Sequence, residues 1–239
     1  MERKKKKTYL VVLWTITLVI VVGACLLRFT GVAGGKGVLE VVDFDGQEVS
    51  EIALDVDAGK VEIKYGPIFQ VEYRYPKKFA PKVELNKGKL TVKQSMTSWN
   101  FNGLFGNNNN YEMAITIPKG TELTSLDSAI DLGELEIEGI VASSLTVQND
   151  CGDIKIHNCD GKNLNITSDL GDIDIDNCNY SSVVAQSDLG DVDLFGDFDT
   201  IDAKVDLGEI DIKTDKPTDE VTIKASCELG DVTVNGEDW

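Results

Sequence analysis

Residue types on which most enzyme active sites depend are scarce in this sequence. It contains a single histidine, His157, among its 239 residues, and no glycine-rich loop of the kind that cradles phosphates. Asn158 and Cys159 follow His157, but nothing around them indicates the exposed, low-pKa thiolate that a Cys–His nucleophile needs. We interpret His157 as a surface-turn residue. Carboxylates are so numerous that no single pair stands out for glycoside hydrolysis. The sequence therefore predicts a non-enzymatic protein that requires no cofactor.

Basic residues are scarce in the second half of the chain. Residues 121–239 contain 6 lysines and 29 acidic residues, a net charge of −23, whereas residues 29–120 contain 11 of each sign. A field of this sign repels nucleic acid and anionic polymers and attracts cations or basic partners. Nucleic acid is therefore excluded as a predicted partner.

Cysteines at metal-binding spacing are also lacking. None of the five forms a CxxC pair, and with one histidine in the chain no zinc site is indicated. Cys25 lies in an apolar N-terminal stretch, and the others are Cys151, Cys159, Cys178 and Cys227. Cys159 and Cys178 are 19 residues apart, which is compatible either with a disulfide or with two free thiols stacked in a core.

The N-terminus carries the pattern of a membrane anchor. Residues 1–7 form a basic flank, and residues 8–28 contain 20 consecutive uncharged residues, enough for a helix that crosses a hydrocarbon core of about 30 Å. The positive-inside rule keeps the basic flank in the cytoplasm. We therefore expect a single-pass cell-membrane protein whose C-terminal part is extracytoplasmic, with its own anchor as its membrane contact.

Two other fates of the N-terminus fit the sequence. Val22-Gly23-Ala24-Cys25 resembles a lipobox, in which cleavage leaves Cys25 as a lipid-modified N-terminus. Leu26 and Leu27 continue the apolar run past the cysteine, which favours an uncleaved signal anchor. A cleaved and secreted product is the third alternative. All three place the rest of the chain outside the cytoplasm.

Residues 29–37 are rich in glycine and are predicted to be a flexible linker. In residues 38–120 apolar residues alternate with polar ones, which predicts strands with one buried face. The segment Asp57–Ile63 resembles a degenerate copy of a repeat found later in the chain. We therefore treat residues 38–120 as an N-terminal β-strand region.

The stretch 99–111, WNFNGLFGNNNNY, interrupts this alternation. One interpretation is a long polar loop or an insertion at a coil corner. The other is a contact loop, because aromatic and amide side chains can hold sugars or a partner surface, and long loops on rigid scaffolds often carry function. The candidate contact residues are Trp99, Phe101, Phe105 and Tyr111.

A short motif of the form Asp-Leu-Gly-Asp recurs through residues 121–236. Its glycines are spaced by 19, 19, 19, 18 and 22 residues, and a fixed period in this range indicates stacked coils. Glycine supplies the positive φ that such a bend needs. The structural turn residues are Gly133, Gly152, Gly171, Gly190, Gly208 and Gly230.

Apolar pairs flank each bend at alternate positions, such as Ile173 and Ile175 after Gly171. We expect the motif aspartate to close an Asx-type hydrogen bond and the motif leucine to cap the core, where Cys151 replaces it in one repeat. Signatures of hexapeptide helices and calcium-binding nonapeptide rolls are absent. The predicted fold is all-β, a parallel β-solenoid with coils of about 19 residues, preceded by one transmembrane helix.

Outward positions just after the bends are mostly acidic and are predicted to stack as ladders of like charge. One interpretation is a solvated face that keeps the protein soluble and unaggregated. The other is a ladder that collects a divalent cation or docks a basic partner, since carboxylate oxygens suit hard cations. The cation candidates are Asp153, Asp172, Asp174, Asp191, Asp193 and Asp211.

With these features the chain resembles the bacterial putative-adhesin family known as domain of unknown function 4097. The matching features are the N-terminal anchor, the early strands ending in Ala114–Gly120, the segment Leu123–Leu126 and the Asp-Leu-Gly coils, over residues 38–236. The resemblance implies a repetitive β-strand fold and an adhesin-like role, and for some relatives a link to envelope-stress signalling. Its motifs are structural, so no functional residue is carried over.

Three functions remain open at this point. The leading hypothesis is a surface-exposed adhesin or binding module that contacts a cell-surface polymer or an envelope protein. The second is an envelope-stress accessory protein that acts through a membrane partner. The third is a solenoid enzyme that acts on polysaccharide, which the scarcity of lysine in the repeats disfavours.

Overall fold

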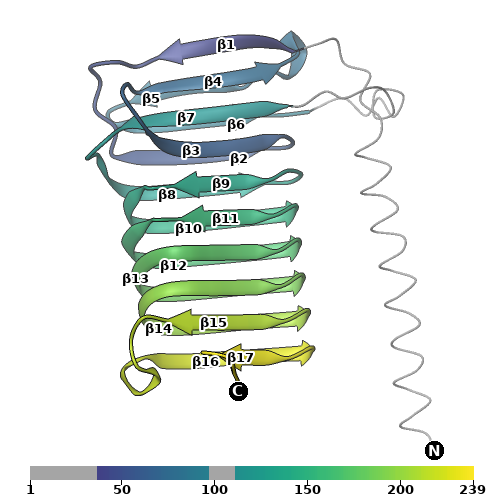
Figure 1. Ribbon diagram of the computed structural model, residues 1–239. Coiled ribbons are helices and arrows are strands. Elements are labelled where there is room, and N and C mark those ends of the chain that lie inside the picture. The colour runs from purple at the N-terminus through teal and green to yellow at the C-terminus, as the bar shows by residue number, and fades with distance from the viewer. Residues whose placement is uncertain (1–36, 97–110) are drawn as a thin grey trace, which may run out of the picture. The chain divides into compact units, whose positions relative to one another are not determined.

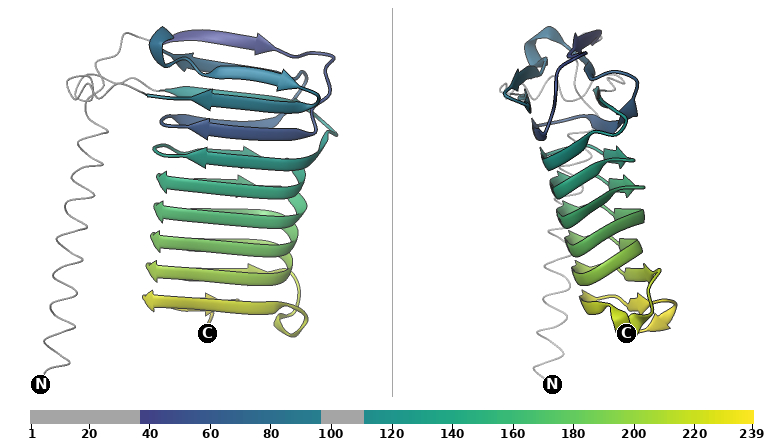
Figure 2. Two further views of the ribbon diagram at one scale, coloured as in Figure 1. Left: turned by 180° about the vertical axis from the view of Figure 1, so that it is seen from behind. Right: turned by 90° about the vertical axis from the view of Figure 1, so that its left-hand side faces the viewer.

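The computed structural model describes residues 37–96 and 111–239, and nearly all regular structure in these ranges is β-strand (Figure 1). The strands stack as successive coils, and each coil of the repeats contributes a strand to each of two facing sheets (Figure 2). Neighbouring coils pair in parallel, with partners 19 residues apart, as in Leu145, Leu164 and Val183. The predicted all-β parallel β-solenoid with coils of about 19 residues is confirmed.

The anchor expected over residues 8–28, with Cys25, lies outside the described ranges, as do the basic flank and residues 29–36 of the linker. Within the described ranges, no helix is both long enough and apolar enough to span a membrane. The helical elements there are two 3-10 turns, η1 (Lys77–Phe79) and η3 (Thr218–Glu220).

The first coil in the sequence is inserted between two coils that follow it in the sequence. Its strands β2 and β3 pair in parallel with β6 and β7 on one side and with β8 and β9 on the other. The bend between β2 and β3 contains Gly59, whose backbone lies against Gly133 of the first full repeat. The bounds of these strands are β2 (Glu51–Val56), β3 (Lys60–Gly66), β6 (Lys89–Gln94), β7 (Glu112–Pro118), β8 (Glu122–Ile130) and β9 (Leu135–Glu138).

Antiparallel strands complete the N-terminal end of the stack. β1 (Val38–Asp43) pairs with β4 (Gln70–Tyr75), β4 pairs with β7, and β5 (Lys82–Asn86) pairs with β6. Aromatic side chains fill the core here: the rings of Tyr75 and Tyr111 stack with centroids 5.2 Å apart. This end therefore differs from the repeats both in strand direction and in the size of its core residues.

The repeats continue to the C-terminus with regular parallel pairing, and strands β13 and β14 each run around a corner from one sheet to the other. β18 departs from this pattern, because it pairs antiparallel with β17 and ends that sheet. The strands are β10 (Val141–Cys151), β11 (Ile154–His157), β12 (Asp160–Leu170), β13 (Ile173–Leu189), β14 (Val192–Leu207), β15 (Ile210–Thr214), β16 (Thr222–Leu229), β17 (Val232–Val234) and β18 (Glu237–Asp238).

The glycines of the bends stack directly on one another along one edge of the solenoid. Gly171 has a φ of +142°, and a Cβ built on it would overlap the carbonyl oxygen of Gly152 in the preceding coil. Gly152 meets Gly133 in the same way, and Gly190 meets Gly171. Each bend therefore requires glycine for two reasons, its positive φ and the close approach of the neighbouring backbone.

Two expectations about the bends are corrected by the structure. The motif leucines do not cap the core: Leu170 is only half-buried, Leu207 is 43% exposed and Leu229 is 61% exposed. In three bends the carboxylate that accepts a backbone N–H is that of the residue after the glycine, rather than that of the aspartate before the leucine. Cys151, which replaces the leucine, is buried as predicted.

The opposite corner uses asparagine in a left-handed conformation. Asn158 and Asn177 have φ of +55° and +51°, values that asparagine tolerates better than most residues. Their side chains form a ladder in which Asn177 Nδ2 donates to Asn158 Oδ1 at 2.6 Å. The 18-residue repeat departs from register at this corner, where two residues of one coil face Phe195 alone in the next. The bends themselves keep a constant form.

The four cysteines of the described ranges are free, and Cys151, Cys159 and Cys178 are buried. Cys159 and Cys178 stack in consecutive coils, and the Cys159 N–H donates to Cys178 Sγ at 3.4 Å. Of the two alternatives that the spacing left open, the structure therefore has stacked thiols rather than a disulfide.

The core of the repeats consists of aliphatic columns with nearly complete burial. Ile154, Ile173 and Val192 are at most 1% exposed and lie one above another. Each buried aliphatic side chain contributes about 1.5–3 kcal/mol relative to full exposure, so the columns supply most of the stabilisation. The outward side chains of the same strands are consequently free to differ between the two sheets.

Candidate functional site

The two outer faces of the repeats have different chemistry. One face is formed by outward side chains of strands that precede the bends, and we call it the polar face. The other is formed by outward side chains that follow the bends, and we call it the acidic face. The polar face comprises Ser144, Thr146, Gln148, Asn163, Asn165, Thr167, Ser182 and Gln186. The acidic face comprises Glu134, Glu136, Asp153, Asp172, Asp174, Asp191, Asp193, Glu209, Asp211 and Asp231.

Many carboxylates of the acidic face already have partners inside the protein. Asp172 Oδ1 accepts the backbone N–H of Asp191 at 2.9 Å, and Asp191 Oδ1 accepts that of Glu209 at 2.8 Å. Asp153 Oδ1 accepts the Asp172 N–H at 3.2 Å in the same column. These contacts join each coil to the next and offset part of the repulsion between like charges about 4.8 Å apart.

Lysines neutralise the N-terminal end of the acidic face. Lys60 Nζ lies 2.8 Å from Glu136, and Lys155 Nζ lies 2.8 Å from Glu134. The hydrogen bond from Lys155 lowers the pKa of Glu134. At the next positions along the stack, Asp174 and later carboxylates have fewer cationic neighbours, so the negative charge is concentrated toward the C-terminal half of this face.

Asp193 and Asp211 occupy the same column on adjacent coils but titrate differently. Partial burial, together with the charges of Asp211 and Asp174, raises the pKa of Asp193. A hydrogen bond from Lys213 lowers the pKa of Asp211, which also accepts a hydrogen bond from Thr233 Oγ1 at 2.8 Å. One carboxylate of the ladder is thus unfavourably placed and its neighbour is satisfied.

The six cation candidates are distributed along a ladder rather than gathered at one point. Asp153, Asp172 and Asp191 form one column, and Asp174, Asp193 and Asp211 form a second column two residues further along their strands. Within the described ranges, no group of three or more histidine, cysteine or acidic side chains is arranged to hold a metal ion. The arrangement is that of a charged surface.

The polar face carries three uncharged rows that run along the solenoid axis. Ser144, Asn163 and Ser182 lie in register in one row. A second row contains Thr146 and Asn165, and a third contains Gln148, Thr167 and Gln186. Successive side chains in a row are therefore spaced by the distance between strands, about 4.8 Å.

These side chains are accessible and unengaged. Asn163, Asn165 and Thr167 are exposed, as are Gln148 and Gln186. Within the described part of the chain, none of the eight side chains of the polar face makes a hydrogen bond to another protein group, in contrast to the acidic face. Their donors and acceptors are therefore available to a ligand, which needs only to displace water.

The predicted contact loop is described only at its last residue. Trp99, Phe101 and Phe105 lie outside the described ranges. Tyr111 is buried, at 8% exposure, with its ring stacked on Tyr75. The structure therefore places Tyr111 in the core, where it supports the N-terminal end of the stack. His157, interpreted as a surface-turn residue, is half-buried, with Nδ1 3.9 Å from Asp176 Oδ2.

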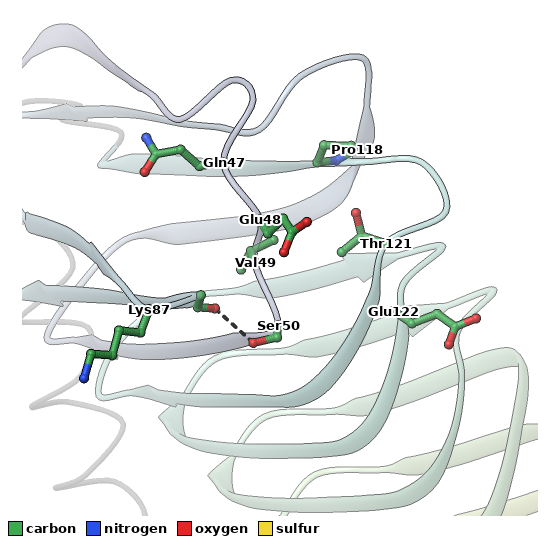
Figure 3. A pocket seen from close by; sticks show the side chains of 9 residues that line it. Gln47, Glu48, Val49, Ser50, Lys87, Pro118, Thr121 and Glu122 are labelled. Carbon is green, nitrogen blue, oxygen red and sulfur yellow. Dashed lines mark hydrogen bonds between the residues drawn. The ribbon is translucent and has the colours of Figure 1, made fainter.

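A cavity of about 460 Å³ opens at the edge opposite the bends, between the turn that leads into β2, the β5–β6 turn and the β7–β8 connection (Figure 3). Ser50 Oγ donates to the Gly88 carbonyl at 3.3 Å across it. Its charged lining groups, Lys87 and Glu122, point away from each other (Figure 3). The arrangement offers neither a nucleophile with a base nor convergent ligands.

Sequence reasoning identified the acidic ladders but missed the polar face. Acidic residues attract notice because their charge is unusual, whereas serine, threonine and asparagine on alternate positions resemble an ordinary solvated strand. The signal was present as a 19-residue recurrence of uncharged polar residues before each bend, as at Thr146 and Asn165. The backbone-binding role of Asp172 depended on the register between coils, which only the structure supplies.

Comparisons with known proteins agree with this architecture. A putative adhesin from Bacteroides fragilis is 19% identical, with a TM-score of 0.54, over 82% of this chain and 97% of that chain. A putative adhesin from Parabacteroides distasonis is 14% identical, with a TM-score of 0.43, over 84% and 98% of the two chains. A putative lipid binding protein from the same species is 14% identical, with a TM-score of 0.34, over 88% and 98%.

The first of these likenesses supports the fold alone, since its identity is low. A search among curated proteins finds no match. The family described as Toastrack DUF4097 matches residues 49–238, which include every coil from β2 to β18 and most of the described chain. The anticipated relationship is confirmed, and the chain belongs to the Toastrack DUF4097 family.

Proposed function

We propose that this protein is a non-enzymatic binding module, held at the outer side of a membrane by residues 8–28, whose polar face binds a neutral, extended polymer of the cell surface. The observation that carries the proposal is the contrast between the two faces. The polar face presents unengaged hydroxyl and amide groups in rows, whereas the acidic face uses many of its carboxylates within the fold.

A polysaccharide strand fits the chemistry of the polar face. Its hydroxyl groups donate and accept hydrogen bonds, as do Asn165, Thr167 and Gln186, and none of these groups imposes a charge. The rows are borne by strands with a fully buried core, so they lose little conformational freedom on binding. The net charge of −23 in residues 121–239 repels anionic polymers and thereby favours a neutral one.

The test is retention of the full-length chain, in detergent, on insoluble neutral polysaccharides such as cellulose, chitin and β-glucan, and on the envelope of its own cells. Removing three hydrogen-bonding side chains of one strand, in Asn163→Ala/Asn165→Ala/Thr167→Ala, is expected to weaken retention at least about tenfold, because each lost bond contributes about 1 kcal/mol.

The matched control removes three side chains from the other face, in Glu138→Ala/Asp174→Ala/Asp176→Ala. This variant is expected to bind like the original chain. Equal loss in both variants, or equal retention of all three proteins on every polymer, would contradict the proposal. Loss confined to the acidic-face variant, with capture of a membrane protein from the envelope, would instead favour the accessory role in envelope-stress signalling.

A further inference from the structure

The last coil leaves one strand of the solenoid with an open edge. Within the described ranges, β16 pairs with β14 on one side and with no strand on the other, whereas β18 covers the equivalent edge of the other sheet. Figure 1 shows β16 at the end of the stack that is farthest from β1. An uncovered edge of this length is a site for pairing with another strand.

The core under this edge is also incompletely covered. Ile201, Ala203 and Val205 of β14 are at most 1% exposed. Their counterparts in β16, Ile223, Ala225 and Cys227, are all only half-buried, and Leu229 is 61% exposed. The coil ends with apolar side chains that one more layer would bury.

The direction of the backbone groups in β16 follows from one hydrogen bond. The Leu229 carbonyl accepts the N–H of Gly208 at 3.2 Å and therefore points toward β14. Backbone groups alternate in direction along a strand, so the even-numbered residues direct their N–H and C=O to the open edge. These residues are Thr222, Lys224, Ser226 and Glu228.

This edge is complementary to itself in one antiparallel register. If two copies pair about a two-fold axis through Ser226, the two Ser226 residues exchange both backbone hydrogen bonds. Lys224 then lies opposite Glu228 of the other copy, and the reverse pair forms by symmetry. On the inward side, Ile223 faces Leu229 and Ala225 faces Cys227 of the other copy. Charge, apolar contact and backbone direction agree in this single register.

We propose that β16 is a homodimerisation edge, in which two copies of the chain pair antiparallel about Ser226 and extend one sheet across both molecules. The occupant is a second copy because the match between Lys224 and Glu228 is internal to the strand. The other free edge, β1, carries Glu40 and Asp43 and offers β16 no such match.

The pairing has a consequence that rests on the proposed function. β1 and β16 lie at opposite ends of the stack, so a dimer joined at β16 has its two β1 strands at its two far ends (Figure 1). With both chains held by residues 8–28, this geometry links two facing membranes. The protein then adheres to copies of itself on another cell.

The first test measures association of the full-length chain in detergent at about 0.15 M salt, where surface repulsion is screened beyond roughly 8 Å. Sedimentation equilibrium is expected to show a monomer–dimer equilibrium. Lys224→Glu and Glu228→Lys each create two like-charge contacts and are expected to weaken the dimer about tenfold. An equimolar mixture of the two variants is expected to form the dimer again, because their charges are then complementary.

This rescue separates pairing from any loss of the internal contact between Lys224 and Asp202, which the Lys224→Glu variant lacks in the mixture as well. A monomeric chain at about 100 µM, or a mixture that stays monomeric while the original chain dimerises, would overturn the proposal. Filaments in place of dimers would assign β16 to a different partner edge and would overturn it equally.

Crosslinking tests the register. In a chain with Cys25→Ser and Cys227→Ala, Ser226→Cys places two thiols on the two-fold axis and is expected to form a disulfide-linked dimer with a mild oxidant. The control Thr222→Cys places its thiols roughly 26 Å apart in the same dimer and is expected not to crosslink. Equal crosslinking at both positions would contradict the register.

Clustering of phosphatidylcholine vesicles that carry the full-length chain, followed by light scattering, tests the link between membranes. Vesicles with the original chain are expected to cluster, those with either charge variant alone to remain dispersed, and a mixture of the two variant vesicles to cluster. Dimers in detergent without clustered vesicles would refute the membrane-bridging step alone. Loss of both would refute the homodimer.

Discussion

The polar face and the acidic face are built on the same coils, with the same period and the same buried columns, but their outward side chains have opposite fates. Asp172 and Asp191 on the acidic face accept backbone N–H groups of the next coil. Asn165 and Thr167 on the polar face make no contact of this kind within the described chain. The comparison shows that a residue repeated with the period of a solenoid can serve either the fold or its surface, and that hydrogen bonding distinguishes the two.

The cost of each face supports this division. A column of carboxylates about 4.8 Å apart is unfavourable unless its members gain other interactions, which backbone N–H groups and lysines supply on the acidic face. Uncharged side chains have no such cost, so the rows of the polar face need no compensation within the protein. A conserved chemistry on that face would therefore reflect a ligand, and the following predictions test the comparison.

The largest effect is expected where the two faces meet, at the bends. Gly171→Ala places a Cβ against the carbonyl of Gly152 and forces a strained φ, so it is expected to lower the free energy of unfolding by about 3 kcal/mol or more. Gly120→Ala is the control, because its φ is also positive but nothing lies within 4 Å of the added Cβ. It is expected to cost only about 1 kcal/mol. Urea unfolding followed by circular dichroism measures both, and equal losses would show that the stacking of bends contributes nothing.

Much of this architecture could be predicted from the sequence. The spacing of Gly133, Gly152 and Gly171 indicated stacked coils, and the alternation of Ile173 and Ile175 indicated their buried columns. Both signals are local, because every coil must satisfy the same bend and the same core. The register between coils then followed from the period, as the pairing of Leu145 with Leu164 confirms.

What the sequence could not supply depended on contacts between coils of irregular spacing. The coil of β2 and β3 lies against β8 and β9, although 74 residues separate Gly59 from Gly133, and no period announces that insertion. The exposure of Leu207 and Leu229 was also missed, because a leucine in every bend suggests a core position. The bend turns this side chain outward at the corner, where the two sheets leave no room for it inside.

The next effect separates two kinds of aspartate on the acidic face. Asp172→Ala removes the acceptor of the Asp191 N–H and is expected to cost about 1 kcal/mol of stability. Asp174→Ala, two residues further along the same coil, removes a charge that accepts no backbone N–H within the described chain, and it is expected to change stability by less than about 0.5 kcal/mol. Thermal unfolding of both variants at one pH makes the measurement. A larger loss in Asp174→Ala would show that charge, rather than backbone bonding, governs this face.

A smaller effect, with a characteristic pH dependence, distinguishes Asp193 from Asp211. The raised pKa of Asp193 means that its ionised form destabilises the folded state, a cost present above the folded-state pKa and lost as the pH falls through it. The lowered pKa of Asp211 contributes stability above the ordinary carboxyl pKa of about 3.9, which is lost as the pH falls through the folded-state pKa. At pH 7 Asp193→Asn is therefore expected to raise stability and Asp211→Asn to lower it, each by at most about 0.5 kcal/mol, since both groups are substantially hydrated.

The difference between these two variants is expected to shrink in acid, below both folded-state pKa values, where the carboxyls of the original chain are protonated. Unfolding curves from pH 3 to pH 7 measure it. A difference that stays constant over this range would show that the two substitutions act through packing and not through charge.

The smallest effect on stability is expected on the polar face, and it carries the most weight for function. Asn163→Ala/Asn165→Ala/Thr167→Ala removes side chains that form no hydrogen bond within the described chain, so its free energy of unfolding is expected to stay within about 0.5 kcal/mol of the original per site, with no systematic loss. Its binding to a neutral polymer is expected to fall at least about tenfold. A stability loss as large as that of Asp172→Ala would show that these rows support the fold, and the polar face would then have no better claim to a ligand than the acidic one.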